Sequence, residues 1–226
     1  YDEEADGAAL AALAELRSRR MDRELATCLL ALGSNACYRD VYQEASGYLH
    51  EAVALASAAD DALGAAAAYS WLGFVRLLMD DLDGARAAFE AFHEISTGLG
   101  NPQLLAYALS KLGILADAEG RYGDAMCLHM EANALFGGVG DVGGAGYAFS
   151  RASLSAYGLG DFREAMRLGR AGYEAFSEVN HRWGVIAALC RMGFAAFALG
   201  ETTEAGGHFR LALERAHAAQ AISLEL

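Results

Sequence analysis

One segment of the sequence has the residue types of a nucleotide-binding loop. Residues 138-143 read GVGDVG and fit the pattern GxGxxG, in which glycines allow the backbone to approach a pyrophosphate. That function needs a strand before the motif and a βαβ unit around it. A helical pattern precedes the motif instead, and the segment falls at a turn between two expected helices. We therefore assign its glycines to chain reversal.

Histidine and cysteine show no catalytic or metal-binding pattern. The six histidines form no HExxH motif and no recognisable arrangement of Ser, His and Asp or of Cys and His. The four cysteines contain no CxxC pair, and their spacings fit neither a zinc site nor a small disulfide scaffold. The sequence predicts no enzymatic activity, no cofactor and no metal, and its cysteine usage favours a reducing cytoplasm.

Composition indicates an all-α protein. The chain is rich in Ala, Leu, Glu and Arg, which favour helices, and it contains few of the β-branched residues that strands prefer. A net charge of -13 opposes attraction to nucleic acid or to anionic lipid. The longest apolar stretch, 62-75, is shorter than the roughly 20 residues that span a bilayer, so no membrane span is expected.

A period of 40 residues organises the chain. Rows of 40 align five alanines in one column: Ala45, Ala85, Ala125, Ala165 and Ala205. Another column holds four glycines and one serine: Gly33, Gly73, Gly113, Ser153 and Gly193. Such self-similarity is typical of repeat architectures, in which each repeat is one supersecondary unit.

Each row contains two expected helices. Asp61, Asn101 and Asp141 form a column of N-cap residues, whose side chains accept hydrogen bonds from free backbone N–H groups. The column of Gly120, Gly160 and Gly200 can adopt the left-handed conformation that ends a helix. The five predicted helix pairs of a single domain, 1-226, span 22-57, 62-97, 102-137, 142-177 and 182-217. Residues 3-18 are expected to be the second helix of a preceding repeat, which predicts a piece of a longer chain.

These motifs resemble the tetratricopeptide repeat. A first helix of that family carries a large apolar residue and then Leu-Gly, as in Tyr69 with Leu72 and Gly73. Its second helix opens with Gly-x-aromatic-x-x-Ala, as in the segment from Gly120 to Ala125. The resemblance covers almost the whole chain and implies a right-handed α-solenoid of antiparallel helix pairs. The period of 40 is similar to the longer-helix variety of scaffold proteins and of bacterial signal-transduction ATPases and transcription regulators.

The resemblance also implies a binding face, because tetratricopeptide families turn one side of their first helices toward a concave groove. Residues at spacings of three and four share that side of a helix. The predicted groove residues are Phe74, Tyr107, Ser110, Tyr147, Ser150 and Tyr157. A neighbouring column holds three cations in successive repeats: Lys111, Arg151 and Arg191.

Two interpretations of the three cations remain open. Packed helices lie about 8 to 10 Å apart, so Lys111, Arg151 and Arg191 could form a ladder of roughly 20 Å that suits an acidic peptide or an elongated anionic ligand. Alternatively, each cation pairs with a local carboxylate on a solvated face, where such pairs contribute little.

The expected function is non-catalytic binding. We predict a module that binds a protein or peptide partner or an anionic small-molecule effector, with no direct contact to nucleic acid and no membrane association. The leading hypothesis places it in the sensing region of a larger cytoplasmic bacterial transcriptional regulator or signal-transduction ATPase. The alternative is a free-standing scaffold that binds peptide segments of protein partners.

Overall fold

The computed structural model describes residues 3–19 and 21–223, and within them it contains helices and short turns but no strand. The helices in that part of the chain are α1 Glu3–Arg19, α2 Asp22–Tyr38, α3 Tyr42–Ala58, α4 Ala62–Leu78, α5 Leu82–Gly98, α6 Pro102–Ala118, α7 Tyr122–Gly138, α8 Val142–Gly158, α9 Phe162–Glu178, α10 Arg182–Ala198 and α11 Thr202–Ser223. The protein is therefore all-α, as its composition predicted.

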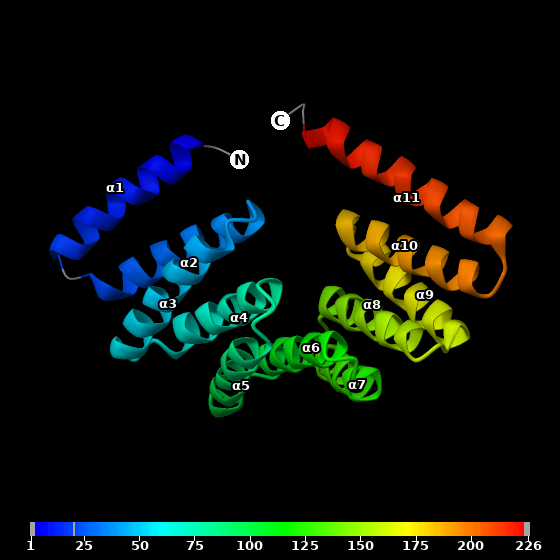
Figure 1. The fold of residues 1–226 in the computed structure, drawn as a ribbon, viewed down its shortest axis with the longest axis horizontal. Coiled ribbons are helices and arrows are strands. Elements are labelled where there is room, and N and C mark those ends of the chain that lie inside the picture. The colour runs from blue at the N-terminus through cyan, green and yellow to red at the C-terminus, as the bar shows by residue number, and fades with distance from the viewer. Residues whose placement is uncertain (1–2, 20, 224–226) are drawn as a thin grey trace. The chain divides into compact units, whose positions relative to one another are not determined.

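The helices form two compact units (Figure 1). Unit 1 is Tyr1–Asn101 and holds α1 to α5, and unit 2 is Pro102–Leu226 and holds α6 to α11. Within each unit every helix packs against the next one in the chain, and short turns reverse the direction between them. Each unit is an α-solenoid of antiparallel helix pairs.

Within each unit, the first helices of adjacent repeats form a layer. In unit 2, α6 contacts α8 and α8 contacts α10, and in unit 1 α2 contacts α4. Among the described residues, no comparable contact joins the second helices α7 and α9. Because first helices lie closer together than second helices, the layer of first helices is the inner layer of each unit.

The turn geometry explains where the helices begin and end. The side chains of Asp61 and Asp141 accept hydrogen bonds from the backbone N–H groups three residues later, at 3.0 and 2.7 Å. The backbone is left-handed at the predicted stop positions, with φ of +74° at Gly120, +79° at Gly160 and +83° at Gly200. The last helix is longer than predicted: α11 continues to Ser223, where the prediction ended at 217, because three of the six added residues are Ala, the best helix former, and none is Gly or Pro.

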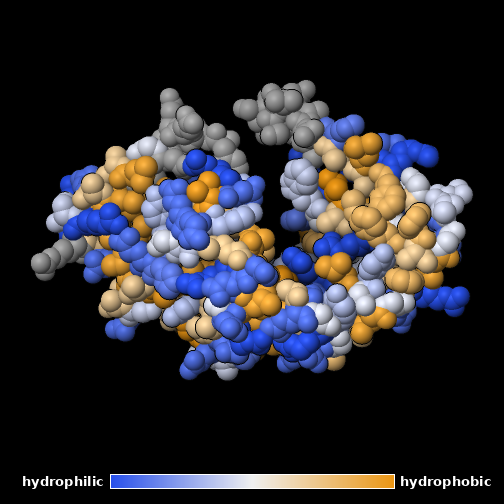
Figure 2. Space-filling model, in the orientation of Figure 1, coloured by the Kyte–Doolittle hydropathy of each residue, from blue (hydrophilic) through white to orange (hydrophobic). Residues whose placement is uncertain are grey.

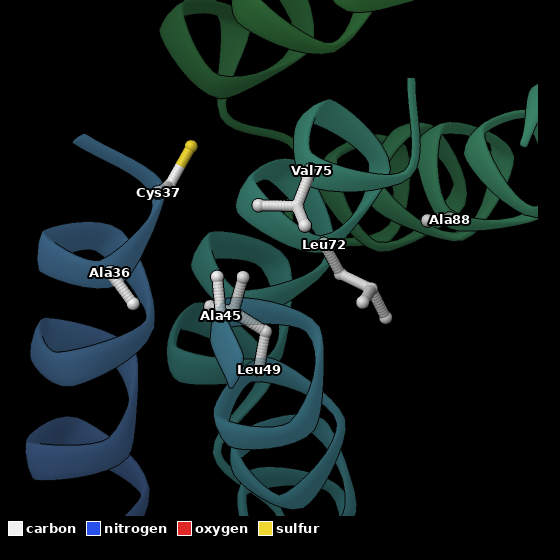
Figure 3. Close-up of a cluster of buried hydrophobic side chains, with 7 residues drawn as sticks. All are labelled: Ala36, Cys37, Ala45, Leu49, Leu72, Val75 and Ala88. Atoms are coloured by element: carbon white, nitrogen blue, oxygen red, sulfur yellow. The ribbon is translucent and has the colours of Figure 1, made fainter. Parts of the chain in front are cut away.

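The helices of a pair approach closely at the glycine column. A Cβ atom added to Gly73 would lie 2.5 Å from the ring of Phe89, and one added to Gly33 would lie 2.6 Å from the side chain of Leu49. Both large side chains are fully buried. Figure 3 shows Leu49 one turn from Ala45 in the cluster that also includes residues of α2 and α4. The absent Cβ thus makes room for a buried side chain of the second helix.

Ser153, the departure from the glycine column, is matched by a compensating change in its partner helix. The position that holds Leu49 and Phe89 in earlier repeats is Gly169 in α9. Ser153 is buried, and its hydroxyl donates a hydrogen bond to the carbonyl of Ala165 at 2.7 Å. Exchanging the small residue between the two helices preserves their close approach.

The surface mixes polar and apolar residues. On the face drawn in Figure 2, hydrophobic side chains reach the surface over α10 and α11 of unit 2. None of the helices, over their described residues, is long and apolar enough to cross a bilayer.

Candidate functional site

Unit 2 contains a pocket of about 460 Å³ on its inner layer. First helices α6, α8 and α10 contribute side chains to it, together with the turns that precede α8 and α10. The lining residues are Tyr107, Asp141, Gly143, Gly144, Tyr147, Ser150, Arg151, Phe176, His181, Trp183, Gly184, Ala187 and Arg191. Five of the nine predicted groove residues are among them.

The repeat explains why these residues meet. Tyr147 and Arg151 are four residues apart on α8, and Ala187 and Arg191 occupy the same two columns on α10, so each pair lies on one side of its helix. Because α8 contacts α10, the two arginines are brought to the same height in adjacent helices. Small residues where α8 and α10 begin, including Gly143, leave space for the cavity.

Arg191 is the buried cation of the pocket. Its Nη1 donates a hydrogen bond to the hydroxyl oxygen of Ser150 at 2.6 Å. Burial, followed by repulsion from Arg151, lowers the pKa of Arg191 to about 10. The guanidinium is still protonated at neutral pH, but the protein stabilises its charge poorly.

Arg151 lies over an aromatic ring. Its Cζ is 5.4 Å from the centroid of the Tyr147 ring, which is cation–π geometry. Over the described residues, neither Arg151 nor Arg191 has a carboxylate within ion-pair distance. The carboxylate in the pocket lining, Asp141, accepts hydrogen bonds from the N–H of Gly144 and from the amide of Gln103. The pocket therefore holds two positive charges without a paired anion.

Ser110 suggests a second position for Arg151. The pair Ser110 and Arg151 lies 40 residues before Ser150 and Arg191, so the two pairs are equivalent in the repeat. The Ser110 hydroxyl is buried and has no hydrogen-bond partner among the described residues. Arg151 is thus less constrained than Arg191, which is fixed by its serine.

The rest of the pocket wall is aromatic. Tyr107 packs edge-on against Phe136, with 4.8 Å between ring centroids, and burial, then the nearby Asp141 carboxylate, raises the pKa of Tyr107. Phe176 and the exposed Trp183 add apolar surface. This combination suits a ligand that carries both an anionic group and an apolar body.

His181 is both a helix cap and a lining residue. Its Nδ1 accepts a hydrogen bond from the backbone N–H of Gly184 at 2.9 Å. An accepting Nδ1 carries no proton, so the neutral ring has its N–H on Nε2. Sequence reasoning placed His181 in the cap column but did not predict its place in the pocket, and it also missed Trp183 and Phe176. For His181 a signal was available, because the turn before a first helix adjoins the inner layer.

The remaining predicted residues lie elsewhere. Phe74 belongs to α4 of unit 1, where its ring meets Trp71 edge-on at 6.2 Å between centroids. Tyr157 lies six residues beyond Arg151 on α8, and its ring packs against Phe162 at 5.1 Å between centroids. Lys111 is on α6 but is not a lining residue of the pocket. Of the three cations that were expected to form a ladder, the two arginines line the pocket and Lys111 does not.

A buried polar cluster beside this region has triad residue types but the wrong order. Ser155 donates a hydrogen bond to Asp117 at 2.7 Å, and Nε2 of the fully buried His129 is 3.3 Å from the other carboxylate oxygen. A catalytic triad needs histidine between serine and aspartate, so that the imidazole can remove the serine proton. Here aspartate lies between them, so the cluster does not fit nucleophilic catalysis.

A pocket of about 570 Å³ near the start of α10 and the end of α9 includes Arg182 and Arg215, but none of the predicted groove residues lines it. Over residues 3–19 and 21–223, no group of three His, Cys, Asp or Glu side chains could hold a metal ion.

Solved structures with the same fold clarify what the chain resembles. No protein-family model and no curated protein matches the sequence. BtubC (BKLC) from P. vanneervenii is similar over 95% of this chain and 90% of its own, with a TM-score of 0.78 and 15% identity. A Rap protein complexed with competence and sporulation factor matches over 91% of this chain and 57% of its own, with a TM-score of 0.78 and 13% identity.

A third similar structure is a signal transduction ATPase with numerous domains from Pyrococcus horikoshii, which has a tetratricopeptide repeat sensor. It matches over 87% of this chain with a TM-score of 0.70 and 12% identity, and this chain spans 31% of its length. Other matches include kinesin light chain with tetratricopeptide-like repeats from Podosopora anserina, at a TM-score of 0.65 and 14% identity. The fold is that of a tetratricopeptide-like α-solenoid.

Proposed function

We propose that this protein is a non-catalytic binding module that recognises an anionic segment of a protein or peptide in the pocket of unit 2. The observation that carries the proposal is the pair of arginines, one buried and one stacked on Tyr147, with no paired carboxylate. Guanidinium groups form strong, geometrically defined hydrogen bonds with carboxylates. An incoming anion supplies the charge that the pocket lacks.

The two arginines have different roles in this proposal. Arg191 is held by Ser150 and presents a fixed donor at the base of the pocket. Arg151 is held by a ring contact, which a carboxylate replaces with a charge-assisted hydrogen bond. Lys111, at the equivalent position of α6, extends the same positive column toward a longer ligand.

Similar structures support a sensing role. Two of them are a Rap protein complexed with competence and sporulation factor and a signal transduction ATPase with a tetratricopeptide repeat sensor. By analogy, we place this module in the sensing region of a larger cytoplasmic bacterial regulator that has an ATPase or DNA-binding segment. The complete reading frame tests this part, because the absence of such a segment next to residues 1-226 would refute it.

Peptide selection tests the binding function itself. We expect the full chain to enrich Asp- and Glu-containing peptides from a random 12-residue display library. The double variant Arg151→Glu with Arg191→Glu should lose that enrichment. A matched control, Arg170→Glu with Arg210→Glu, makes the same charge change at two exposed positions of unit 2 and should retain it. Enrichment without acidic residues, or equal loss in both variants, would contradict the proposal.

A further inference from the structure

An apolar surface continues the inner layer of unit 2 beyond the arginines. Leu154 and Tyr157 on α8 are 41% and 37% exposed, and Phe194 and Phe197 on α10 are 55% and 64% exposed. Leu154 and Phe194 share one repeat column, and Tyr157 and Phe197 share another. We call these four residues the apolar ladder.

The apolar ladder is in register with the basic pair. Leu154 follows Arg151 by three residues, and Phe194 follows Arg191 by three residues. We call Arg151 with Arg191 the basic rung, Leu154 with Phe194 the first apolar rung and Tyr157 with Phe197 the second. A helix rises 1.5 Å per residue, so along the helix axes the first apolar rung lies about 4.5 Å and the second about 9 Å from the basic rung. Two parallel helices thus present a basic rung followed by two apolar rungs.

The exposure of Leu154 is specific to its position in the chain. α8 has α6 on one side and α10 on the other, so the exposure of Leu154 is not that of a terminal helix. The equivalent residue on α6, Ile114, is 7% exposed. A contact within unit 2 also fixes the ring of Phe194, which packs edge-on against Phe209 at 5.2 Å between centroids. A rigid exposed ring binds a ligand with little loss of side-chain entropy.

We infer that the pocket and the apolar ladder form one composite site for a peptide segment in which an acidic residue lies within three residues of two large apolar side chains. The acidic group pairs with Arg151 and Arg191, and the apolar side chains pack on Leu154 and Phe197 and their neighbours. An extended chain advances about 3.3 Å per residue, so roughly three residues span the 9 Å between the outer rungs. The inference rests on the proposed function and adds the ligand's composition and polarity.

The net charge favours a short peptide segment over a second copy of this chain as the occupant of the apolar ladder. A copy carries a net charge of -13, and bringing two such molecules together is opposed over their whole surfaces. A short acidic segment brings its negative charge only to the two arginines. The apolar ladder is therefore assigned to a peptide segment of a partner.

Selections from the same peptide library against three forms of the full chain test the inference. The forms are the wild type, Leu154→Ser with Phe197→Ser, and the control Leu213→Ser, which changes a 56% exposed leucine on α11. Wild-type ligands should contain Asp or Glu followed or preceded within three residues by two of Leu, Ile, Phe, Tyr or Trp. Selected peptides should bind the double variant at least about tenfold more weakly, since truncating an apolar contact in a binding site has effects of this size. They should bind the control within about twofold of the wild type, because an apolar residue outside the site adds no contact.

Circular dichroism and melting curves establish that the variants fold. If the double variant does not fold, the single variant Phe197→Ser, at the most exposed residue of the apolar ladder, replaces it in the test. Acidic peptides whose affinity depends on the arginines but not on the apolar ladder would overturn this inference and leave the proposed function intact. Peptides that ignore the arginines would overturn both. A dimer seen by sedimentation and lost in Phe197→Ser would assign the surface to self-association and refute the inference.

Discussion

Replacing Arg191 with Met should stabilise the ligand-free protein. Methionine keeps the apolar length of the side chain but removes the charge. Burial and Arg151 lower the pKa of Arg191 to about 10, and one pKa unit corresponds to about 1.4 kcal/mol. Compared with a solvent-exposed arginine, the charged form of Arg191 is disfavoured by about 3 kcal/mol in the folded state.

The hydrogen bond from Arg191 to Ser150 offsets part of that penalty. A bond to a charged group contributes about 1.5 to 3 kcal/mol, and the variant loses it. We expect Arg191→Met to raise the free energy of unfolding by about 1 kcal/mol, which corresponds to an increase in Tm of about 2–4 °C for a chain of this size. Urea denaturation followed by circular dichroism measures the change.

The control is Arg170→Met, at an exposed position of α9, where we expect a change within about 0.5 kcal/mol. Arg191→Met should also weaken binding of acidic peptides. Higher stability combined with weaker binding is typical of a residue retained for function. If Arg191→Met unfolds more readily than the wild type, Arg191 is a structural residue and the binding argument loses its main support.

Three other substitutions test the fold and the site. Gly73→Ala places a Cβ 2.5 Å from the ring of Phe89 and should destabilise the protein by about 1–3 kcal/mol. Its control, Gly123→Ala, has no atom near the added Cβ and should stabilise the protein by up to about 1 kcal/mol. Equal melting temperatures for the two variants would contradict the close packing at the glycine column. His181→Asp should preserve the α10 cap and weaken binding of acidic peptides, since it adds a carboxylate to the pocket, and calorimetry with a selected peptide would show unchanged affinity if His181 lies outside the site. Hydrogen bonds from the Gly84 N–H and from Arg76 lower the pKa of Asp81 in the folded state. The contribution of Asp81 to stability is therefore present above its unfolded pKa of about 4 and is lost as the pH falls through the lower folded pKa. The difference in stability between wild type and Asp81→Asn should shrink in acid, and a constant difference from pH 7 to pH 3 would exclude this linkage.

Most of the fold follows from local sequence features. Asp61 and Asp141 cap helices, and Gly120 and Gly160 end them, because a cap bond and a left-handed backbone depend on residues within one turn. The 40-residue period then implies that every unit repeats the same two helices. The end of α11 was missed because no stop signal follows 217, and only the continuous Ala-rich segment shows that the helix goes on.

The candidate site was predictable only in part. The repeat columns, such as the one shared by Arg151 and Arg191, indicated which residues lie at the same height along adjacent helices. It did not indicate that Ser150 holds Arg191 while Ser110 remains unpartnered, because side-chain conformation depends on neighbours in other repeats.

The sequence by itself determined the helices, most of their boundaries, the close contact at the glycine column and the face on which cations gather. These properties depend on local backbone preferences and on a strict repeat. The tertiary structure decided that Arg151 and Arg191 share one pocket with His181 and Trp183, and that the apolar side chains beyond them stay exposed. Such properties depend on how repeats pack across the inner layer, where contacts join residues about 40 positions apart.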